Sequence, residues 1–133
     1  MSKQNRKQFI ASTVMAGAAL VTASSFKTGT KKMLVHHVFF WLKNPSSKKD
    51  LNQLFTGLRT LKGIKTVKQM HIGVPAPTEN RSVVDASYQA SEIIFFENVA
   101  AQKTYQDDPI HKKFIANCSH LWSKVVVYDS MDV

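Results

Sequence analysis

The chain contains little cysteine and little arginine, and each shortage excludes a class of structure or partner. Its 133 residues contain one cysteine, Cys118, which excludes an intramolecular disulfide and a zinc site built on clustered cysteines. Outside the first 23 residues the only arginines are Arg59 and Arg81, and no basic run is interleaved with aromatic residues. Since nucleic-acid readout depends strongly on arginine, nucleic acid is not an expected partner.

The formal net charge of +9 does not change this conclusion. Lys3, Arg6 and Lys7 supply three of the nine excess charges, and the remaining +6 is scattered singly or in pairs, as on a solvated surface. At 44% hydrophobic and 20% charged residues, a chain of this length fits one globular domain.

The N-terminus is predicted to be an export signal, residues 1–23. Basic residues precede an apolar, alanine-rich stretch of about 13 residues, shorter than the roughly 20 that cross a membrane. Residues 5–10 resemble a twin-arginine signal in which lysine replaces the second arginine. We therefore expect export, to the periplasm, with cleavage between Ala23 and Ser24 and no stable membrane anchor afterwards. An uncleaved amphipathic or tethering helix is the alternative.

Residues 24–32 form a polar linker, and residues 33–133 are predicted to form an α+β domain. Strands are expected over residues 34–42, 66–73, 88–96 and 125–128. Helices are expected from a cap at Ser46 or Ser47 to about Lys62, over residues 99–106 after a cap at Asn98, and over residues 109–123. This βαββαβ order is typical of the ferredoxin-like fold, an antiparallel sheet with helices on one face.

The first strand is apolar on both faces, which predicts a partner. One face carries His36, Val38, Phe40 and Leu42, and the other carries Val35, His37, Phe39 and Trp41. A single layer of helices covers only one face. Two sheets packed face to face would bury the other, so we expect a symmetric homodimer.

The segment from Tyr105 to His111 is the leading candidate for chemistry. Pro109 disfavours a helical conformation at Asp108, so one helix is predicted to stop near Asp107 and another to begin at Pro109. His111 then lies in the first turn of the second helix, where the helix dipole favours a neutral imidazole near pH 7. A neutral imidazole beside the phenol of Tyr105 is able to move protons. The alternative is that both are ordinary residues at helix ends.

Two further polar residues are predicted to face the helices. His36 either binds a ligand carbonyl or is a core histidine bonded to the backbone. Glu92 shares a strand face with Ile94, where a buried carboxylate stays protonated, pairs with His36 or His111, or serves as an acid or base. A register slip of one residue would instead place Glu92 at a solvated edge. These three groups suit a metal chemically, but they lie on three separate elements and no metal is expected.

Three segments of the chain together resemble a known family. Residues 33–43 read MLVHHVFFWLK, Tyr105 is followed at the family's spacing by Pro109-Ile110-His111, and residues 125–129 read VVVYD. They resemble the opening strand, the Tyr-x-x-His-Pro-x-His signature and the closing strand of the stress-responsive α/β-barrel (Dabb) family. One position departs from the signature, since Asp108 replaces its first histidine.

The resemblance implies a dimeric α/β barrel with a cavity between sheet and helices in each subunit. Some members of the family are small cyclases that use the signature tyrosine and histidine as a proton-transfer pair. Here these are Tyr105 and His111, with His36 near them. The walls of the cavity are expected to include Phe40, Phe55, Ile94 and Trp122.

The leading hypothesis is an exported, cyclase- or lyase-like acid–base enzyme without a cofactor, acting on a small apolar or aromatic carbonyl compound. His111 would abstract a proton next to the carbonyl, while Tyr105 would stabilise the enolate oxygen. Two alternatives stay open. One is a non-catalytic, stress-related dimer that binds a small molecule, and the other is a cofactor-independent monooxygenase of the dimeric barrel type.

Overall fold

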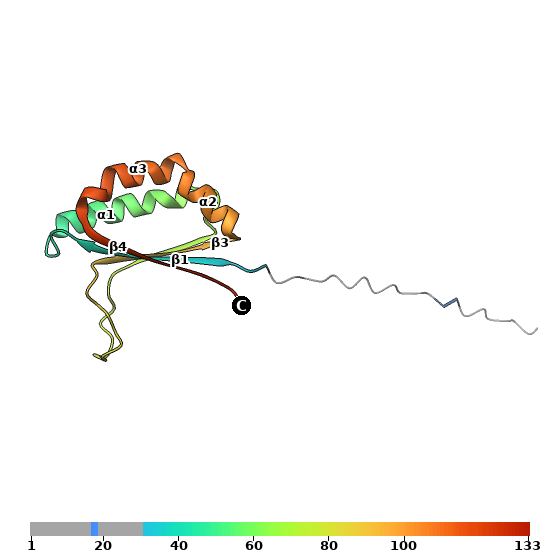
Figure 1. Ribbon diagram of the computed structural model, residues 1–133, viewed down its shortest axis with the longest axis horizontal. Coiled ribbons are helices and arrows are strands. Elements are labelled where there is room, and N and C mark those ends of the chain that lie inside the picture. Colours follow the sequence, from blue (N-terminus) through green and yellow to red (C-terminus); the bar gives the residue numbers. More distant parts are fainter. Residues whose placement is uncertain (1–16, 19–30) are drawn as a thin grey trace, which may run out of the picture.

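The computed structural model describes residues 17–18 and 31–133, so most of the predicted export signal and linker lies outside the described residues. The described residues form a four-stranded antiparallel sheet in the order β2-β3-β1-β4. The strands are β1 (Leu34–Leu42), β2 (Gln69–Gly73), β3 (Ala90–Phe96) and β4 (Trp122–Met131). The helices α1 (Lys48–Thr60), α2 (Val99–Asp107) and α3 (Pro109–Cys118) all cover the same face of the sheet (Figure 1). The expected ferredoxin-like α+β fold is confirmed.

Three helix starts follow directly from the local sequence. Ser47 Oγ accepts a hydrogen bond from the Asp50 N–H at 3.1 Å, and Asn98 Oδ1 accepts one from Ala101 at 2.8 Å. Asp108 caps α3 in the same way, and Pro109 is the first residue of that helix. Each cap satisfies a backbone donor that the helix leaves free, and the caps predicted at Ser47 and Asn98 are confirmed.

The largest error in the predicted boundaries is at the end of α3. The helix was expected to run to Ser123 but ends at Cys118, and a 3₁₀ turn over Ser119–Leu121 leads into β4 at Trp122. The strand pairs with β1 from Leu42↔Trp122 to Leu34↔Met131, far beyond the predicted residues 125–128. Pairing along the whole of β1 therefore overrides the helical spacing of the apolar residues. β2 and β3 also start three and two residues later than predicted.

The core lies between the sheet and the helices, and it closes tightly where α1 meets α3. Gly57 of α1 permits this approach, since a Cβ there would overlap Cys118 Sγ and lie 3.0 Å from Phe114 Cδ2. Cys118 is 3% exposed and packs in the core. The side chains buried with it include Leu34, Val38, Phe40, Leu54, Leu58, Leu61, Ile94, Phe96 and Leu121.

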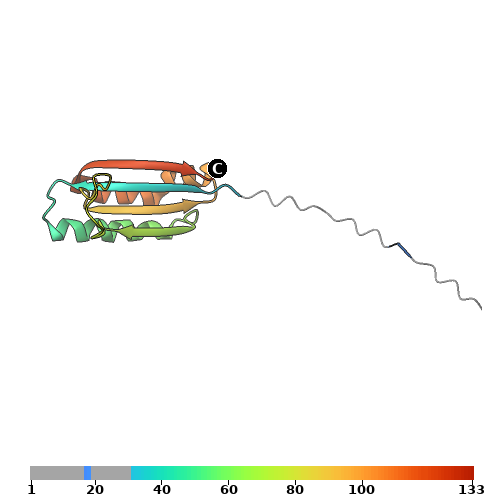
Figure 2. The same cartoon turned by 90° about the horizontal axis from the view of Figure 1, so that it is seen from below.

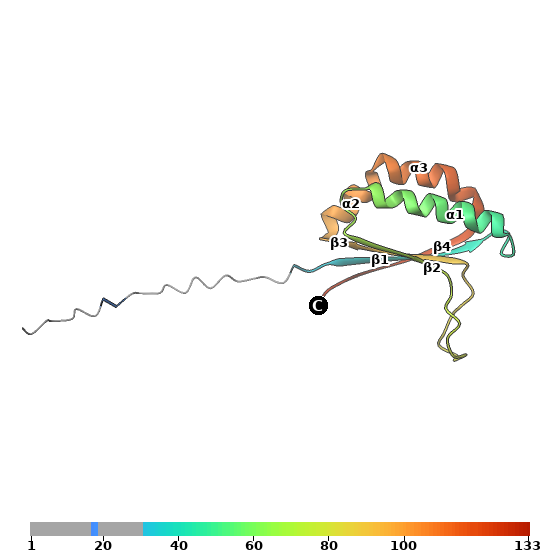
Figure 3. The ribbon, with the colours of Figure 1, turned by 180° about the vertical axis from the view of Figure 1, so that it is seen from behind.

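The opposite face of the sheet carries no helix, as the view of that face shows (Figure 2). Val35, His37, Phe39 and Trp41 of β1 lie on it and are partly exposed. The connection from β2 to β3, residues 74–89, extends from this side of the sheet (Figure 3). Trp41 Nε1 donates to Ser87 Oγ at 3.0 Å and so ties the base of the connection to the sheet. In the part of the chain that is described, no helix is both long and apolar enough to cross a membrane.

Candidate functional site

The break between α2 and α3 brings Tyr105 and His111 together. Asp108 adopts an extended conformation, with φ −65° and ψ 137°, so the chain turns before Pro109 starts α3. Tyr105 lies in the last turn of α2 and His111 in the first turn of α3. Their ring centroids are 4.7 Å apart. The phenol–imidazole pair that the sequence predicted is therefore formed within one bent segment.

His36 approaches this pair from the sheet. Its ring centroid lies 5.9 Å from that of Tyr105, and the residue is 6% exposed. Nδ1 of His36 lies 2.6 Å from Oδ1 of Asp129 on β4, where Asp129 is the register partner of His36. The sequence prediction placed Asp129 after the last strand and assigned it no role. A predicted last strand that included Asp129 and paired with the first strand would have placed Asp129 opposite His36.

A cavity of about 160 Å³ lies between the sheet and α3, beside these rings. Its polar lining comes from His36, Glu92, Gln106 and His111. The apolar lining is Val38, Phe40, Phe114, Ile115, Trp122, Val125 and Val127. The site is thus an apolar hollow in which a few polar groups converge, which is the usual form of a small-molecule site.

Four residues were expected to line the cavity, and two of them do so in the structure. Phe40 and Trp122 do line it, 5.2 Å apart between ring centroids, although Trp122 belongs to β4 rather than to a helix. Ile94 is fully buried in the core, opposite His36 in the pairing of β1 with β3. Phe55 lies in a different groove, between α1 and β2, because the apolar stripe of α1 covers the β2 side of the sheet.

Glu92 faces the cavity, so the predicted register of its strand is correct. It pairs with Val38 in the sheet and is 2% exposed, and its Oε2 has no hydrogen-bond partner among the described residues. Burial raises the pKa of this carboxyl to about 8, which keeps it protonated at neutral pH. The expected partner His36 binds Asp129 instead. Among the described residues, no three histidine, cysteine or acidic side chains are grouped closely enough to hold a metal ion.

The surroundings of His111 and Tyr105 shift the pKa of both side chains. Burial lowers the pKa of His111, and the charge of His36 lowers it further, against a hydrogen bond to the Gln106 carbonyl and the charge of Asp108. Desolvation is the largest of these causes, and it acts in the direction that the sequence predicted from the helix dipole. Burial, together with the nearby Glu92 carboxylate, raises the pKa of Tyr105, and its hydroxyl is buried without a partner.

The arrangement combines a base and a donor that line one apolar hollow, His111 and Glu92, with a second donor, Tyr105, packed against His111. At pH 7 the His111 imidazole is neutral and accepts a proton, whereas the Glu92 carboxyl and the Tyr105 hydroxyl keep theirs. Environments that separate the pKa values of neighbouring groups in this way are suited to general acid–base chemistry. The fold and this site define a small ferredoxin-like protein with an acid–base cavity between sheet and helices.

Residues 34–132 match the family described as Stress responsive A/B Barrel Domain, and the chain belongs to this family. The resemblance inferred from three segments is confirmed over nearly the whole described domain. A comparison with curated protein sequences gives no match.

Solved structures support the fold. The chain is similar to a Dabb family protein with a ferredoxin-like fold from Mesorhizobium loti, with 21% identity and a TM-score of 0.64 over 77% of this chain and 98% of that one. It is similar to the hydroxynitrile lyase of Passiflora edulis, with 21% identity and a TM-score of 0.65 over 77% and 95%. A dimeric ferredoxin-like protein of unknown function from Thermobifida fusca has 17% identity and a TM-score of 0.61 over 76% and 92%.

Proposed function

We propose that the protein is an acid–base enzyme that abstracts a proton from a small carbonyl compound, or from the hydroxyl of its adduct, without a cofactor. One observation carries this proposal. Within the described residues, the Tyr105 hydroxyl and Glu92 Oε2 are both buried without a partner, close to an imidazole that burial keeps neutral. Glu92 lines the cavity, and Tyr105 packs against His111, which also lines it. Buried polar atoms are almost always paired, so two unpaired ones beside this cavity support a ligand oxygen as their partner.

The chemistry follows from the protonation states. His111 takes the proton as base, and the electron pair left behind is delocalised onto the substrate oxygen. Tyr105 and Glu92 donate hydrogen bonds to that oxygen, in a mostly apolar site where such bonds are stronger than in water. The resulting enolate or alkoxide is then protonated, attacks a second carbonyl of the same molecule, or expels a leaving group. A hydroxynitrile lyase with this fold is consistent with the last route.

The volume limits the substrate. A cavity of about 160 Å³ is close to the ~150 Å³ hollow that holds one benzene molecule. The lining around Phe40, Phe114 and Trp122 is apolar and aromatic. We therefore propose a substrate with one ring or a short chain and one carbonyl or hydroxyl group.

The test is exchange of substrate hydrogen for deuterium. A panel of small aryl and alkyl ketones is incubated with the protein in D₂O, and the α-hydrogen signal is followed by proton NMR. We expect the wild type to exchange at least one ketone faster than buffer does, and His111→Ala to lose about 10²–10⁴-fold of that rate. His120→Ala, in the exposed 3₁₀ turn before β4, is the matched control and keeps the rate.

Two results would contradict the proposal. One is a His111→Ala variant with the full exchange rate. The other is a ligand that co-purifies, is identified by native mass spectrometry, and fills the cavity with neither exchange nor turnover. The second result would leave a non-catalytic binding protein.

We also propose that two copies form a homodimer through the sheet face that has no helix. Val35, Phe39 and Trp41 make this face apolar, and several proteins with the same fold are described as dimeric. Phe39→Lys is expected to halve the mass measured by analytical ultracentrifugation, since it places a charge in the centre of the interface. Val99→Lys, at an exposed position at the start of α2, leaves the mass unchanged. A wild type that sediments as a monomer at high micromolar concentration would refute the dimer.

A further inference from the structure

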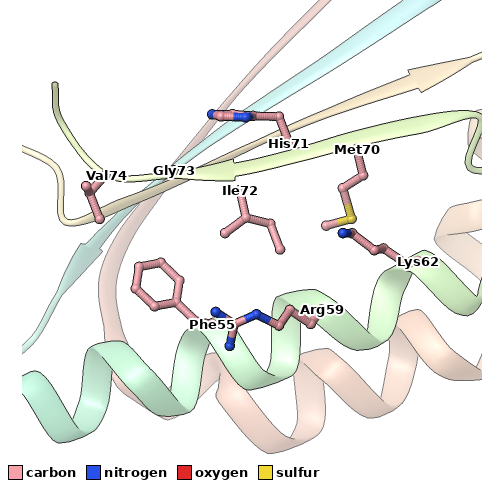
Figure 4. Close-up of a pocket in the computed structure, with 8 residues that line it drawn as sticks. All are labelled: Phe55, Arg59, Lys62, Met70, His71, Ile72, Gly73 and Val74. Carbon is pink, nitrogen blue, oxygen red and sulfur yellow. The ribbon is translucent and has the colours of Figure 1, made fainter.

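A second groove lies on the other side of the helical layer, between α1 and the edge strand β2. Its volume is about 470 Å³. Met70 and Ile72 point from β2 towards α1, and Phe55 and Arg59 extend from α1 towards them (Figure 4). Lys62 reaches the same space beside Met70 (Figure 4). No lining residue is shared with the cavity of the candidate site.

The groove has an apolar floor and a cationic rim. Phe55, Met70 and Ile72 are partly buried hydrophobic residues packed against the core. Arg59 and Lys62 are exposed, and the Arg59 guanidinium lies 5.8 Å from the centroid of the Phe55 ring. Contact with this ring holds the guanidinium over the groove.

The two cations are not neutralised within the described residues. No acidic residue lines the groove there, and the ion pairs found among residues 31–133 involve neither Arg59 nor Lys62. Two positive charges along the helical side of an apolar trough, the Arg59 guanidinium towards Phe55 and the Lys62 ammonium beside Met70 (Figure 4), complement a molecule with an anionic head and a hydrocarbon tail. The volume lies in the range of about 300–1,000 Å³ that is typical of small-molecule sites.

We propose that this groove binds a free single-chain amphipathic carboxylate of medium length. Its carboxylate accepts hydrogen bonds from Arg59, Lys62 adds a second attractive charge along the groove, and its chain covers Phe55, Met70 and Ile72. Charge-assisted bonds from a guanidinium are directional, so the head group is fixed at the Arg59 end of the groove. This site is independent of the proposed acid–base chemistry, and neither needs the other.

Decanoate, below its micellar concentration, is the probe. The full chain labelled with ¹³C at its methionine methyl groups is titrated, and the Met70 resonance is followed by NMR. We expect a saturable shift of Met70, and a dissociation constant about tenfold higher in the Arg59→Gln/Lys62→Gln double variant. Lys65→Gln/Lys68→Gln removes the same charge from neighbouring exposed positions and leaves the constant unchanged.

Decan-1-ol and lipid vesicles distinguish this proposal from binding by the hydrocarbon chain alone and from binding to a lipid surface. Decan-1-ol, which has the same chain without the charge, is expected to bind at least about tenfold more weakly. Equal affinity for decanoate and decan-1-ol would overturn the proposal, as would equal losses in the two double variants. Co-sedimentation with phosphatidylglycerol vesicles, lost in both double variants and with no saturable Met70 shift by decanoate, would also overturn it in favour of a lipid surface.

Discussion

Asp129 Oδ1 lies 2.6 Å from Nδ1 of His36, and the pair connects a half-exposed edge of the sheet to a buried ring. The Asp129 side chain is 48% exposed, whereas that of His36 is 7% exposed. The Nδ1–H group of His36 donates a hydrogen bond to the carboxylate, which leaves Nε2 of His36 as an acceptor. Because the ring of His36 packs beside that of Tyr105 and lines the cavity, Asp129 determines which nitrogen of His36 accepts a hydrogen bond at the site.

Asp129→Asn is therefore expected to impair the proposed exchange reaction without unfolding the protein. The amide keeps the size of the carboxylate but removes a negative charge beside the site, so the rate should fall about tenfold and its pH profile should change. Exchange rates in D₂O between pH 5 and 9 measure this. Asp132→Asn is the matched control, because Asp132 accepts a hydrogen bond from the Met33 backbone, a role that an amide oxygen also fills. Identical profiles for the two variants would remove Asp129 from the site.

The fold was predictable because the helix caps and the alternation of apolar residues, which are local sequence features, agree with the strand pairing in the structure. Ser47, Asn98 and Asp108 each cap the predicted helix through their own side chains, and Pro109 separates α2 from α3. Alternation in β1 and β3 placed His36 and Glu92 on the helical face. Each of these inferences needs only a few consecutive residues.

The rest of the site depends on contacts between distant residues. Asp129 is 93 positions from His36, and only the register of β1 with β4 brings them together. Phe55 lies on the apolar side of α1, but the sequence of a helix does not tell which strands that side covers. The same limit explains why Trp122 was assigned to a helix, since its contacts with Phe40 and Phe114 are satisfied equally by a strand.

The carboxyl of Glu92 makes the stability of the fold depend on pH. Its pKa is about 8 in the native state and near 4.5 when exposed, so the native state holds one more proton between these values. The free energy of unfolding therefore falls as the pH rises through this window, by up to ~1.4 kcal/mol per pH unit. Glu92→Gln keeps the shape and has no such proton, so we expect it to be more stable than the wild type at pH 7.

Urea unfolding between pH 5 and 8.5 measures this effect. The stability difference between Glu92→Gln and the wild type should grow with pH and level off above about 8, because both states of the wild type are then ionised. Glu79→Gln, in the exposed loop after β2, gives a curve parallel to that of the wild type. A pH-independent difference for Glu92→Gln would show that the carboxyl has a partner in solution.

The Tyr105 hydroxyl is expected to be important for activity and dispensable for folding. It is buried without a partner, and removing an unpaired buried polar atom relieves a penalty of about 1–3 kcal/mol. Tyr105→Phe should therefore unfold at the same or a higher urea concentration than the wild type, while the proposed exchange falls at least about tenfold. Full exchange activity in Tyr105→Phe would assign the donor role to Glu92 alone, and a loss of stability would show that the hydroxyl is paired.

The close contact between α1 and α3 predicts that Gly57→Ala lowers the stability of the domain, although helix propensity alone would predict an increase. Replacing a glycine inside a helix by alanine ordinarily stabilises it by about 1 kcal/mol. Gly57→Ala should instead destabilise the domain by about 1–3 kcal/mol, because the new Cβ overlaps Cys118 Sγ and crowds Phe114. Cys118→Ala removes the overlapping sulfur atom. A double-mutant cycle measured by urea unfolding should therefore show that Gly57→Ala costs less in the Cys118→Ala background, and additive effects would contradict the close packing.

We propose, finally, that residues 1–23 direct export and are then removed. The basic start, the short apolar stretch and the small residues before Ser24 together fit a cleavable signal. Expression of the full chain in a Gram-negative host should yield a periplasmic protein whose intact mass corresponds to residues 24–133. Ala23→Arg blocks the cleavage site and should leave the longer chain, whereas Thr28→Arg, in the linker, should be processed normally. A cytoplasmic product with the full mass in the wild type would refute export by this segment. A membrane-bound product that retains residues 1–23 would instead establish an uncleaved tether.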